Sequence, residues 1–249
     1  MKRLFTGLSD PGLLRSTNQD AYYIDPEGRF FVVADGMGGH AGGQEASRIA
    51  TQIIQTYLEE NWATAEPSHL MLEQAFLKAN QAILQDQRQH PERSDMGTTA
   101  VAIMFREETQ PWCAHIGDSR LYRLRGSKLE QITEDHTWVA RAMKVGEITP
   151  DQARMHPLRH VLAQCLGRED LRQVDVQSLH TQPGDRLLLC SDGLTEELSD
   201  QIIASHLKSI RACEKAAISL VNAAKDKGGR DNITVVIVSI DGMIRSDFH

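Results

Sequence analysis

The stretch TTAVAIMFREETQPWCAHIGDSRLYRLRGSKLEQI, residues 98–132, contains four short runs rich in β-forming residues. The runs cover residues 98–105, 112–116, 121–124 and 128–132, and glycines and charged residues separate them. Short runs joined directly by turns are typical of consecutive antiparallel strands. The stretch therefore predicts an antiparallel sheet rather than one built from alternating strands and helices.

The segments on both sides of this stretch supply helices and further strands. Apolar residues recur at helical spacing over residues 44–61 and 70–89, which follow an apolar strand at 30–34. Further strands are expected at 174–176, 186–190 and 233–240, and further helices at 200–208 and 213–227. Because strands and helices do not alternate one for one, we predict an α+β fold, with mostly antiparallel sheets and helices on their outer faces.

Residues 138–159 interrupt this regular pattern. They are weakly helical and polar, and Gly146, Pro150 and Pro157 break them, so we expect an excursion on the surface. No internal repeat, charge run or low-complexity linker divides the chain. We therefore predict one domain spanning residues 1–249.

Charge and cysteine usage exclude several classes of protein. Lys+Arg 27 against Asp+Glu 34 gives a net charge of -7, which has the wrong sign for neutralising the phosphates of a nucleic acid. The first apolar residues soon meet Thr6, Ser9 and Asp10, and no run reaches the roughly 18 apolar residues of a membrane helix, so neither a signal peptide nor a membrane partner is expected. The four cysteines lack the paired spacing of a zinc site, and we expect a reduced, cytoplasmic chain: Cys113, Cys165, Cys190 and Cys213.

Four aspartates lie at the ends of predicted strands, each with a glycine nearby: Asp35, Asp118, Asp192 and Asp231. Each alone is compatible with an ordinary turn. The sheets of one domain can, however, bring several strand ends to the same rim, and converging carboxylates repel one another unless a cation neutralises them. Oxygen ligands without a Cys/His cluster favour magnesium or manganese.

Residues 15–20, RSTNQD, place a guanidinium near a carboxylate. Arg15 can hold a phosphoryl group through two parallel hydrogen bonds, while Asp20 reaches a metal directly or through water. The alternative is that Arg15 is an ordinary solvated surface charge.

The glycine-rich segment 35–43 allows two further hypotheses. The spacing of Gly36, Gly38 and Ala41 matches a relaxed dinucleotide-binding pattern, but a second helix follows instead of a parallel strand. His40 can protonate a leaving oxygen, or it can simply bond to the backbone of the turn. His136, after the last strand of the opening stretch, is expected to orient local backbone.

Taken in order, seven segments resemble the metal-dependent protein serine/threonine phosphatases, the protein phosphatase 2C family in its compact bacterial form. The segments are 15–20, 35–43, 96–99, 117–120, 133–136, 191–193 and 230–232. The resemblance implies a four-layer αββα sandwich, in which helices flank two antiparallel β-sheets and a binuclear metal centre lies at one end. It also implies that residues 137–160 form the variable flap of the family.

The resemblance also implies the metal ligands. Asp35 is the bridging ligand, Gly36 binds through its carbonyl, and Asp192 and Asp231 are terminal ligands. Asp118 together with Asp192 forms a third, weaker site, so two or three Mg²⁺ or Mn²⁺ ions are expected.

Other residues receive supporting roles by the same resemblance. Arg15 holds the phosphate, and Asp20 and Asn232 lie behind the ligands and support them. His40 is the candidate general acid, although residues 37–39 separate it from the Asp-Gly pair that a histidine follows directly in animal members. A metal-bound water is the other candidate for that role.

The activity implied is hydrolysis of phosphoserine and phosphothreonine by direct attack of a hydroxide held between the metals. Segments 112–115, 160–171 and 187–198 resemble the cyanobacterial members that act on the phosphoserine form of the nitrogen-regulatory protein PII. Phosphorylated PII is therefore the expected partner, and a monomer is expected. The alternative is a non-catalytic regulatory module on the same fold that has lost its metals.

Overall fold

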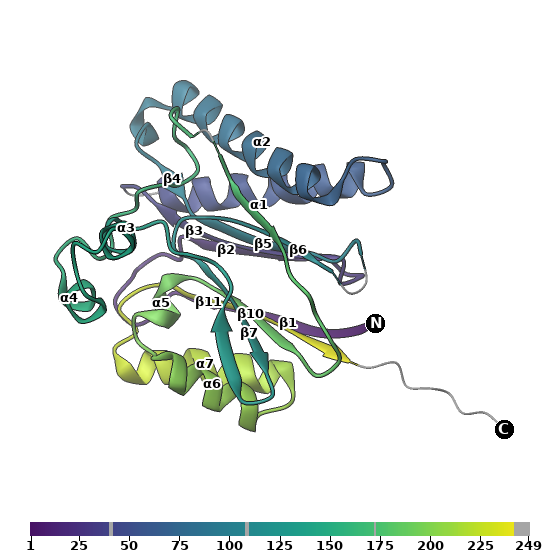
Figure 1. Cartoon of the computed structure of the whole chain (residues 1–249). Helices are drawn as coiled ribbons and strands as arrows, with labels where there is room; N and C mark the ends of the chain where they lie inside the picture. The colour runs from purple at the N-terminus through teal and green to yellow at the C-terminus, as the bar shows by residue number, and fades with distance from the viewer. Residues whose placement is uncertain (40–41, 108–109, 172, 242–249) are drawn as a thin grey trace.

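Two antiparallel sheets lie face to face in the computed structural model, which describes residues 1–39, 42–107, 110–171 and 173–241 (Figure 1). The first sheet has the strand order β1 (Lys2–Asp10), β11 (Ile233–Asp241), β10 (Arg186–Cys190), β7 (Arg120–Arg125) and β8 (Lys128–Gln131). The second has the order β2 (Asp20–Ile24), β3 (Phe30–Met37), β5 (Ala100–Met104), β6 (Trp112–Ile116) and β9 (Asp175–Ser178), and the short β4 (Gly97–Thr98) pairs with β3. Every strand pairing within the described residues is antiparallel.

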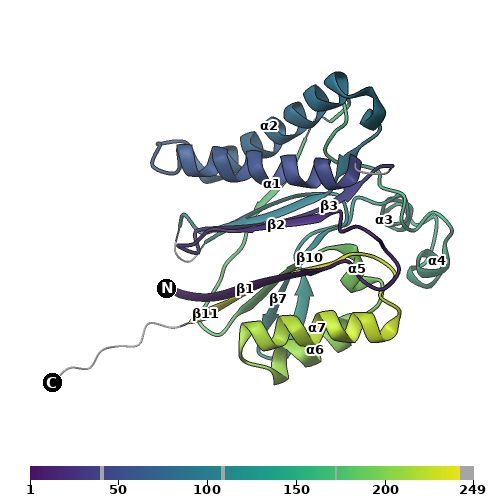
Figure 2. The same cartoon turned by 180° about the vertical axis from the view of Figure 1, so that it is seen from behind.

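Helices cover the outer face of each sheet, as the view from behind also shows (Figure 2). On the second sheet lie α1 (Gly42–Asn61) and α2 (Ser68–Gln89), with a 3-10 turn at Pro91–Arg93; on the first lie α5 (Asp192–Thr195), α6 (Asp200–Ser209) and α7 (Cys213–Lys227). The four layers confirm the predicted αββα sandwich. Two short helices, α3 (Trp138–Lys144) and α4 (Pro150–Met155), occupy the predicted excursion.

Strand β3 shows why a continuous apolar run belongs in a middle layer. Side chains alternate between the two faces of a strand. Phe30 and Val32 therefore pack with the helices α1 and α2, while Phe31 and Val33 pack between the two sheets. Both faces of the strand are buried over residues 30–34, so apolar residues are required at each of these positions.

Two strands at the N-terminus were absent from the sequence-based expectation. Strand β1 pairs with β11 over nine residues, and β2 pairs with β3. Both are edge strands whose residues are mostly only partly buried, so their sequences lack a continuous apolar run. The expected strand over residues 98–105 also divides at Thr99, whose backbone N–H bonds the carbonyl of Asp35 (2.9 Å).

The turn between β2 and β3 fixes a register on which the site depends. Asp25 is fully buried and accepts backbone N–H bonds from Glu27 (3.0 Å) and Arg29 (2.9 Å), and the Arg29 guanidinium also bonds it (2.6 Å). The register that follows from this turn pairs Asp20 with Asp35. Among the described residues, no helix combines the length and the apolar character needed to cross a membrane.

Replacing Asp25 tests this turn. Because Asp25→Ala leaves N–H donors and the Arg29 charge without their acceptor, we expect a loss of about 3–5 kcal/mol in the free energy of unfolding. Urea denaturation measures the change. Asp25→Asn keeps one acceptor oxygen and is expected to lose less; equal stability of Asp25→Ala and wild type would contradict this role.

The same carboxylate gives a pH dependence with a defined sign. Burial acts to raise the pKa of Asp25, but the hydrogen bonds from Arg29 outweigh it and the pKa is lowered. A lowered folded-state pKa stabilises the fold above the unfolded pKa of about 3.9, and this contribution disappears as the pH falls through the folded-state value. The stability difference between wild type and Asp25→Asn should therefore shrink below about pH 4.

Candidate metal centre

Four strand ends meet at one cavity of about 290 Å³. Asp35 comes from β3, Asp118 follows β6, Asp192 begins α5 directly after β10, and Asp231 precedes β11. The structure thus brings together the four aspartates that the sequence singled out. A larger cavity of about 540 Å³ lies near His69 and Trp112, but these four carboxylates do not line it.

The carboxylates in this cavity repel one another. Burial raises the pKa of Asp35 well above its usual range, and the negative charges of Asp20, Asp192 and Asp118 raise it further. Burial and the charge of Asp192 likewise raise the pKa of Asp118. The pKa of Asp192 is raised by burial and by Asp231. The site therefore favours positive charge.

Two buried oxygens in the cluster are available as ligands. Asp20 Oδ2 accepts a hydrogen bond from Ser191 (2.7 Å), but Asp20 Oδ1 and Asp192 Oδ1 are buried and have no hydrogen-bond partner among the residues that the structure describes. Burial raises the pKa of Asp20 to about 7, against the hydrogen bonds that lower it. A buried acceptor without a donor is costly, and a hard divalent cation satisfies such oxygens directly. The residues present therefore fit Mg²⁺ or Mn²⁺.

Close packing fixes the backbone around Asp35. Thr98 Oγ1 donates to the Asp35 carbonyl (2.8 Å), and the Asp35 N–H donates to Thr99 Oγ1 (3.0 Å). A Cβ added at Gly36 would lie 1.9 Å from the carbonyl oxygen of Gly43, at the start of α1. Only glycine lets β3 and α1 approach this closely, so Gly36 has a structural reason in addition to any role of its carbonyl.

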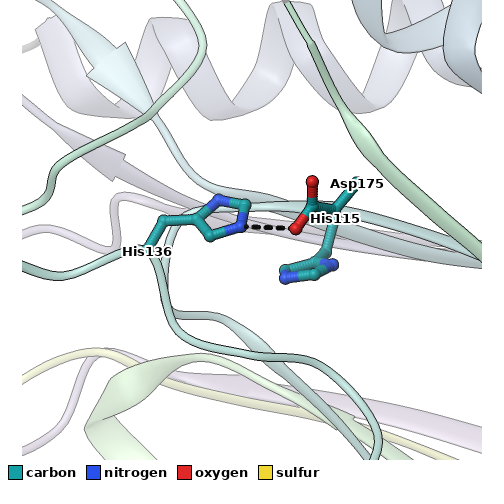
Figure 3. A group of neighbouring side chains, drawn as sticks. All are labelled: His115, His136 and Asp175. Atoms are coloured by element: carbon teal, nitrogen blue, oxygen red, sulfur yellow. Dashed lines mark hydrogen bonds and ion pairs between the residues drawn. The ribbon is translucent and has the colours of Figure 1, made fainter. Parts of the chain in front are cut away.

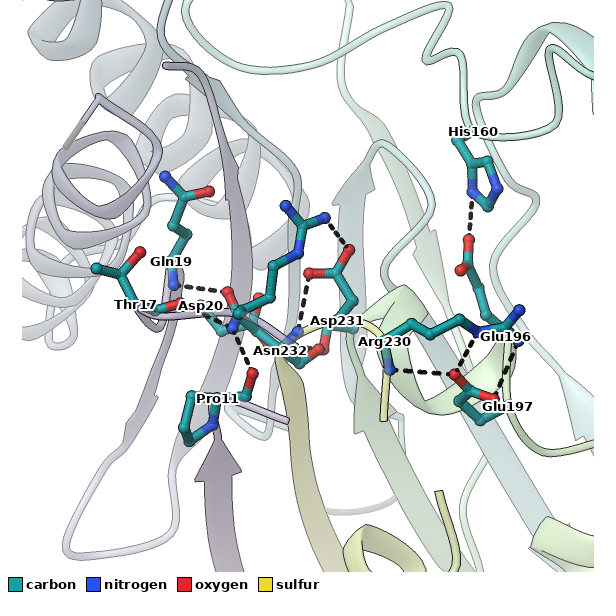
Figure 4. Close-up of polar contacts among 12 residues, drawn as sticks. Pro11, Thr17, Gln19, Asp20, His160, Glu196, Glu197, Arg230, Asp231 and Asn232 are labelled. Carbon is teal, nitrogen blue, oxygen red and sulfur yellow. Dashed lines mark hydrogen bonds and ion pairs between the residues drawn. The ribbon is translucent and has the colours of Figure 1, made fainter. Parts of the chain in front are cut away.

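The loop before β2 carries Arg15 to the mouth of the cavity. Arg15 is half-exposed and pairs with Asp231 (2.6 Å). Asn232 holds this loop in place: its Oδ1 accepts from the Gln19 N–H (2.7 Å), and its Nδ2 donates to the carbonyls of Pro11 and Thr17 (Figure 4). Asn232 was expected to support the metal ligands. Its side-chain bonds fasten the Arg15 loop to the start of β11, and its backbone N–H donates to Asp231 Oδ1 (2.8 Å), so its supporting role stays a prediction.

Two titratable residues, one lining this cavity and one paired with it, were not predicted as site residues. His160 lines the cavity and pairs with Glu196 (Figure 4). Burial, together with the negative charges of Asp192 and Asp231, raises the pKa of Glu196 to about 7. His160 lies in irregular sequence without a local signal, whereas the i,i+4 spacing of Asp192 and Glu196 offered one. His40 lies outside the described residues.

Comparison with known proteins assigns the family. The family described as Protein phosphatase 2C matches residues 15–225. The chain belongs to the protein phosphatase 2C family. It is 35% identical over 238 residues to the serine/threonine phosphatase stp of Listeria monocytogenes, and the match covers 94% of each protein.

Solved structures of the protein phosphatase 2C family agree with the fold. The Mycobacterium tuberculosis serine/threonine phosphatase PstP superposes with a TM-score of 0.88 at 35% identity, covering 96% of this chain and 99% of that one. A structure of the PstP catalytic domain in complex with two manganese ions superposes with a TM-score of 0.87 at 33% identity, covering the same shares of the two chains. Family membership confirms the expected class, a metal-dependent serine/threonine phosphatase. The dinucleotide-binding hypothesis is wrong, because β3 pairs only with antiparallel neighbours among the described strands.

Removing one carboxylate tests the repulsion in the cluster. With metals chelated at pH 8, we expect Asp192→Asn to be more stable than wild type by roughly 1 kcal/mol, or about 2–4 °C in Tm, because one buried negative charge is lost. Differential scanning calorimetry measures the shift.

Asp185→Asn is the matched control for this experiment. Asp185 is also buried, but it pairs with Arg125 (2.7 Å), so its replacement should lower the Tm. A lower Tm for both variants would contradict the repulsion.

Proposed function

We propose that this chain is a Mg²⁺- or Mn²⁺-dependent phosphatase that hydrolyses phosphoserine and phosphothreonine in proteins at the Asp35 cavity. One observation carries the proposal: Arg15 lies at the mouth of the cavity, where two buried carboxylate oxygens, Asp20 Oδ1 and Asp192 Oδ1, have no hydrogen-bond donor among the described residues. Negative ligands for divalent ions and a guanidinium for phosphate thus occur side by side. The manganese-bound PstP relative supports the same cofactor here.

The proposed ligand set is the one that the resemblance to the family implies, and the residues in it all line the cavity. Asp35 would bridge two ions, Gly36 would contribute its carbonyl, and Asp192 and Asp231 would each hold one ion. Asp118, together with Asp192, would hold a third ion. When bound, the ions supply a water of lowered pKa and neutralise the phosphoryl oxygens. Asp20, opposite Asp35 and bonded to Ser191, would support the ligands from behind.

Arg15 would bind the phosphate. Its guanidinium donates to Asp231 at the mouth of the cavity and can instead donate two parallel bonds to phosphate oxygens. Asn232 keeps the Arg15 loop close to β11, so the guanidinium stays within reach. His40 remains our candidate for protonating the leaving serine or threonine oxygen.

We further propose phosphorylated PII as the protein substrate. The support is the resemblance of segments 112–115, 160–171 and 187–198 to the cyanobacterial members, together with the position of His160 and Leu162 at the cavity. We also propose that residues 1–249 act as one domain with a flap at 137–160, and as a cytoplasmic monomer. Comparing kcat/KM for phospho-PII and for a generic phosphothreonine peptide tests the substrate; equal values would contradict it.

Loss of the cofactor or of a ligand should abolish activity. We expect Asp192→Asn to lower kcat for p-nitrophenyl phosphate in Mn²⁺ by at least about 10²-fold, because the ions contribute several kcal/mol to the transition state. Chelation should do the same to wild type, and added Mn²⁺ should restore the rate. Full activity after exhaustive chelation would refute the metal-dependent mechanism, and an inactive wild type with bound Mn²⁺ would favour the non-catalytic module.

The phosphate-binding role of Arg15 can be tested by measuring whether its replacement changes KM or kcat. A lost charge-assisted bond is worth about 1.5–3 kcal/mol, so Arg15→Ala should raise KM for a phosphopeptide by about 10–100-fold. Steady-state kinetics measure both constants. Arg15→Lys keeps the positive charge without the two parallel donors, so its KM should lie between those of wild type and Arg15→Ala. An unchanged KM in Arg15→Ala would contradict phosphate binding.

A further inference from the structure

His136 lies in the segment 133–136, to which the proposed chemistry assigns no role. It follows β8 and lies where β6 ends, beside the Gly117–Asp118 turn. Two hydrogen bonds join it to Gly117. The backbone N–H of His136 donates to the Gly117 carbonyl (2.9 Å). The backbone N–H of Gly117 donates to the ring nitrogen Nδ1 of His136 (3.2 Å). Both backbone polar groups of Gly117 are therefore bound by one residue.

The hydrogen bonds of His136 define its tautomer. A backbone N–H can only donate, so Nδ1 must present its lone pair to Gly117. In the neutral ring the proton is then on Nε2, which faces Asp175 Oδ2 at 3.1 Å (Figure 3). Asp175 thereby orients the ring that receives the Gly117 bond. His115 stacks against the same ring, with centroids 4.6 Å apart, and bonds the Glu134 carbonyl (2.8 Å).

In this arrangement His136 is not available as a ligand for a metal. His115, His136 and Asp175 offer ligand atoms within 4.8 Å of one another. A histidine ligand, however, needs a free lone pair, and Gly117 already occupies the one on His136. Two potential ligands remain, fewer than the three that zinc sites require.

Further hydrogen bonds and an ion pair join residues next to Gly117 to residues next to His136. The Arg120 guanidinium forms a bidentate ion pair with the Asp135 carboxylate, and the shortest N–O distance is 2.6 Å. The backbone N–H of Leu121 donates to Thr133 Oγ1 (3.1 Å). Ser119 bonds Thr99, next to the backbone that holds Asp35. The chain on both sides of Asp118 is thus fixed, while its carboxylate faces the cavity.

His136 also reaches the base of the 137–160 excursion. Its carbonyl accepts from the Ala163 N–H (2.8 Å), and Thr137 and Leu162 form an isolated bridge beside it. A Cβ at Gly117, whose φ is +97°, would lie 2.6 Å from Thr99, so only glycine fits this turn. A single residue therefore contacts both the Asp118 turn and the point where the excursion leaves the fold.

We propose that His136, oriented by Asp175, is a positioning residue that holds the Gly117–Asp118 turn so that the Asp118 carboxylate can bind the third, weaker divalent ion. This inference rests on the proposed function, in which Asp118 is a ligand of that ion. Residues that orient metal ligands typically change metal affinity by about 10–100-fold when they are replaced.

A pair of substitutions isolates the bond from Gly117. In His136→Asn, Oδ1 takes the place of Nδ1 and can still accept from the Gly117 N–H. In His136→Gln, the amide is one carbon farther out and can meet Asp175, but the acceptor near Gly117 is lost. His69→Asn is the control, because His69 stacks on Trp112 at the 540 Å³ cavity without bonding the turn.

Two measurements on the full chain read out the effect. Calorimetric titration of the metal-free proteins with Mn²⁺ should show the weakest site at least about tenfold weaker in His136→Gln, with the tighter sites retained. Hydrogen exchange without metal should show a faster Gly117 amide in His136→Gln than in His136→Asn, with His69→Asn like wild type.

The outcomes separate this inference from the proposed function. Wild-type Mn²⁺ affinity and Gly117 exchange in His136→Gln would overturn the positioning role. Equal losses in His136→Asn and His136→Gln would also overturn it, because they would indicate a general packing role. If wild type binds Mn²⁺ but releases no phosphate, the proposed function fails while the contrast in Gly117 exchange still decides the role of His136.

Discussion

The mutual repulsion of buried carboxylates is the constraint on which this structure depends. Asp35, Asp118 and Asp192 come from three separate strand ends, and each has its pKa raised by burial and by negative neighbours. A fold gains no stability from such a cluster by itself. The surrounding structure must therefore be rigid enough to hold the carboxylates together until cations neutralise them.

The two sheets supply that rigidity. Three apolar layers fix the positions of the strands: one lies between the sheets, and one lies beneath each pair of helices. The positions of the strand ends follow from the positions of the strands. Local bonds then set the last details. Asp25 fixes the turn that places Asp20 opposite Asp35. Asn232 holds the Arg15 loop through hydrogen bonds, and His136 accepts a hydrogen bond from Gly117. The cavity is thus a consequence of packing elsewhere.

The sequence predicted the elements whose two faces are apolar or whose helical stripe is regular. Strand β3 and helix α1 are examples, because burial demands apolar residues at defined intervals. The edge strand β1 was not predicted, because its residues are only partly buried and need not be apolar at regular intervals. At the site, the aspartates were found from strand ends followed by turns. His160 was missed because its place at the cavity depends on how residues 138–162 fold back, which no local pattern encodes.

The formal net charge of -7 has a partial structural explanation, because four of the aspartates counted in it line one cavity. The most direct test is a crystal grown with Mn²⁺ and measured at the manganese absorption edge. We predict anomalous peaks within coordination distance of Asp35, Asp192 and Asp231. Peaks confined to other carboxylates, or an empty cavity at saturating Mn²⁺, would contradict the central claim that this cluster is a binuclear metal centre.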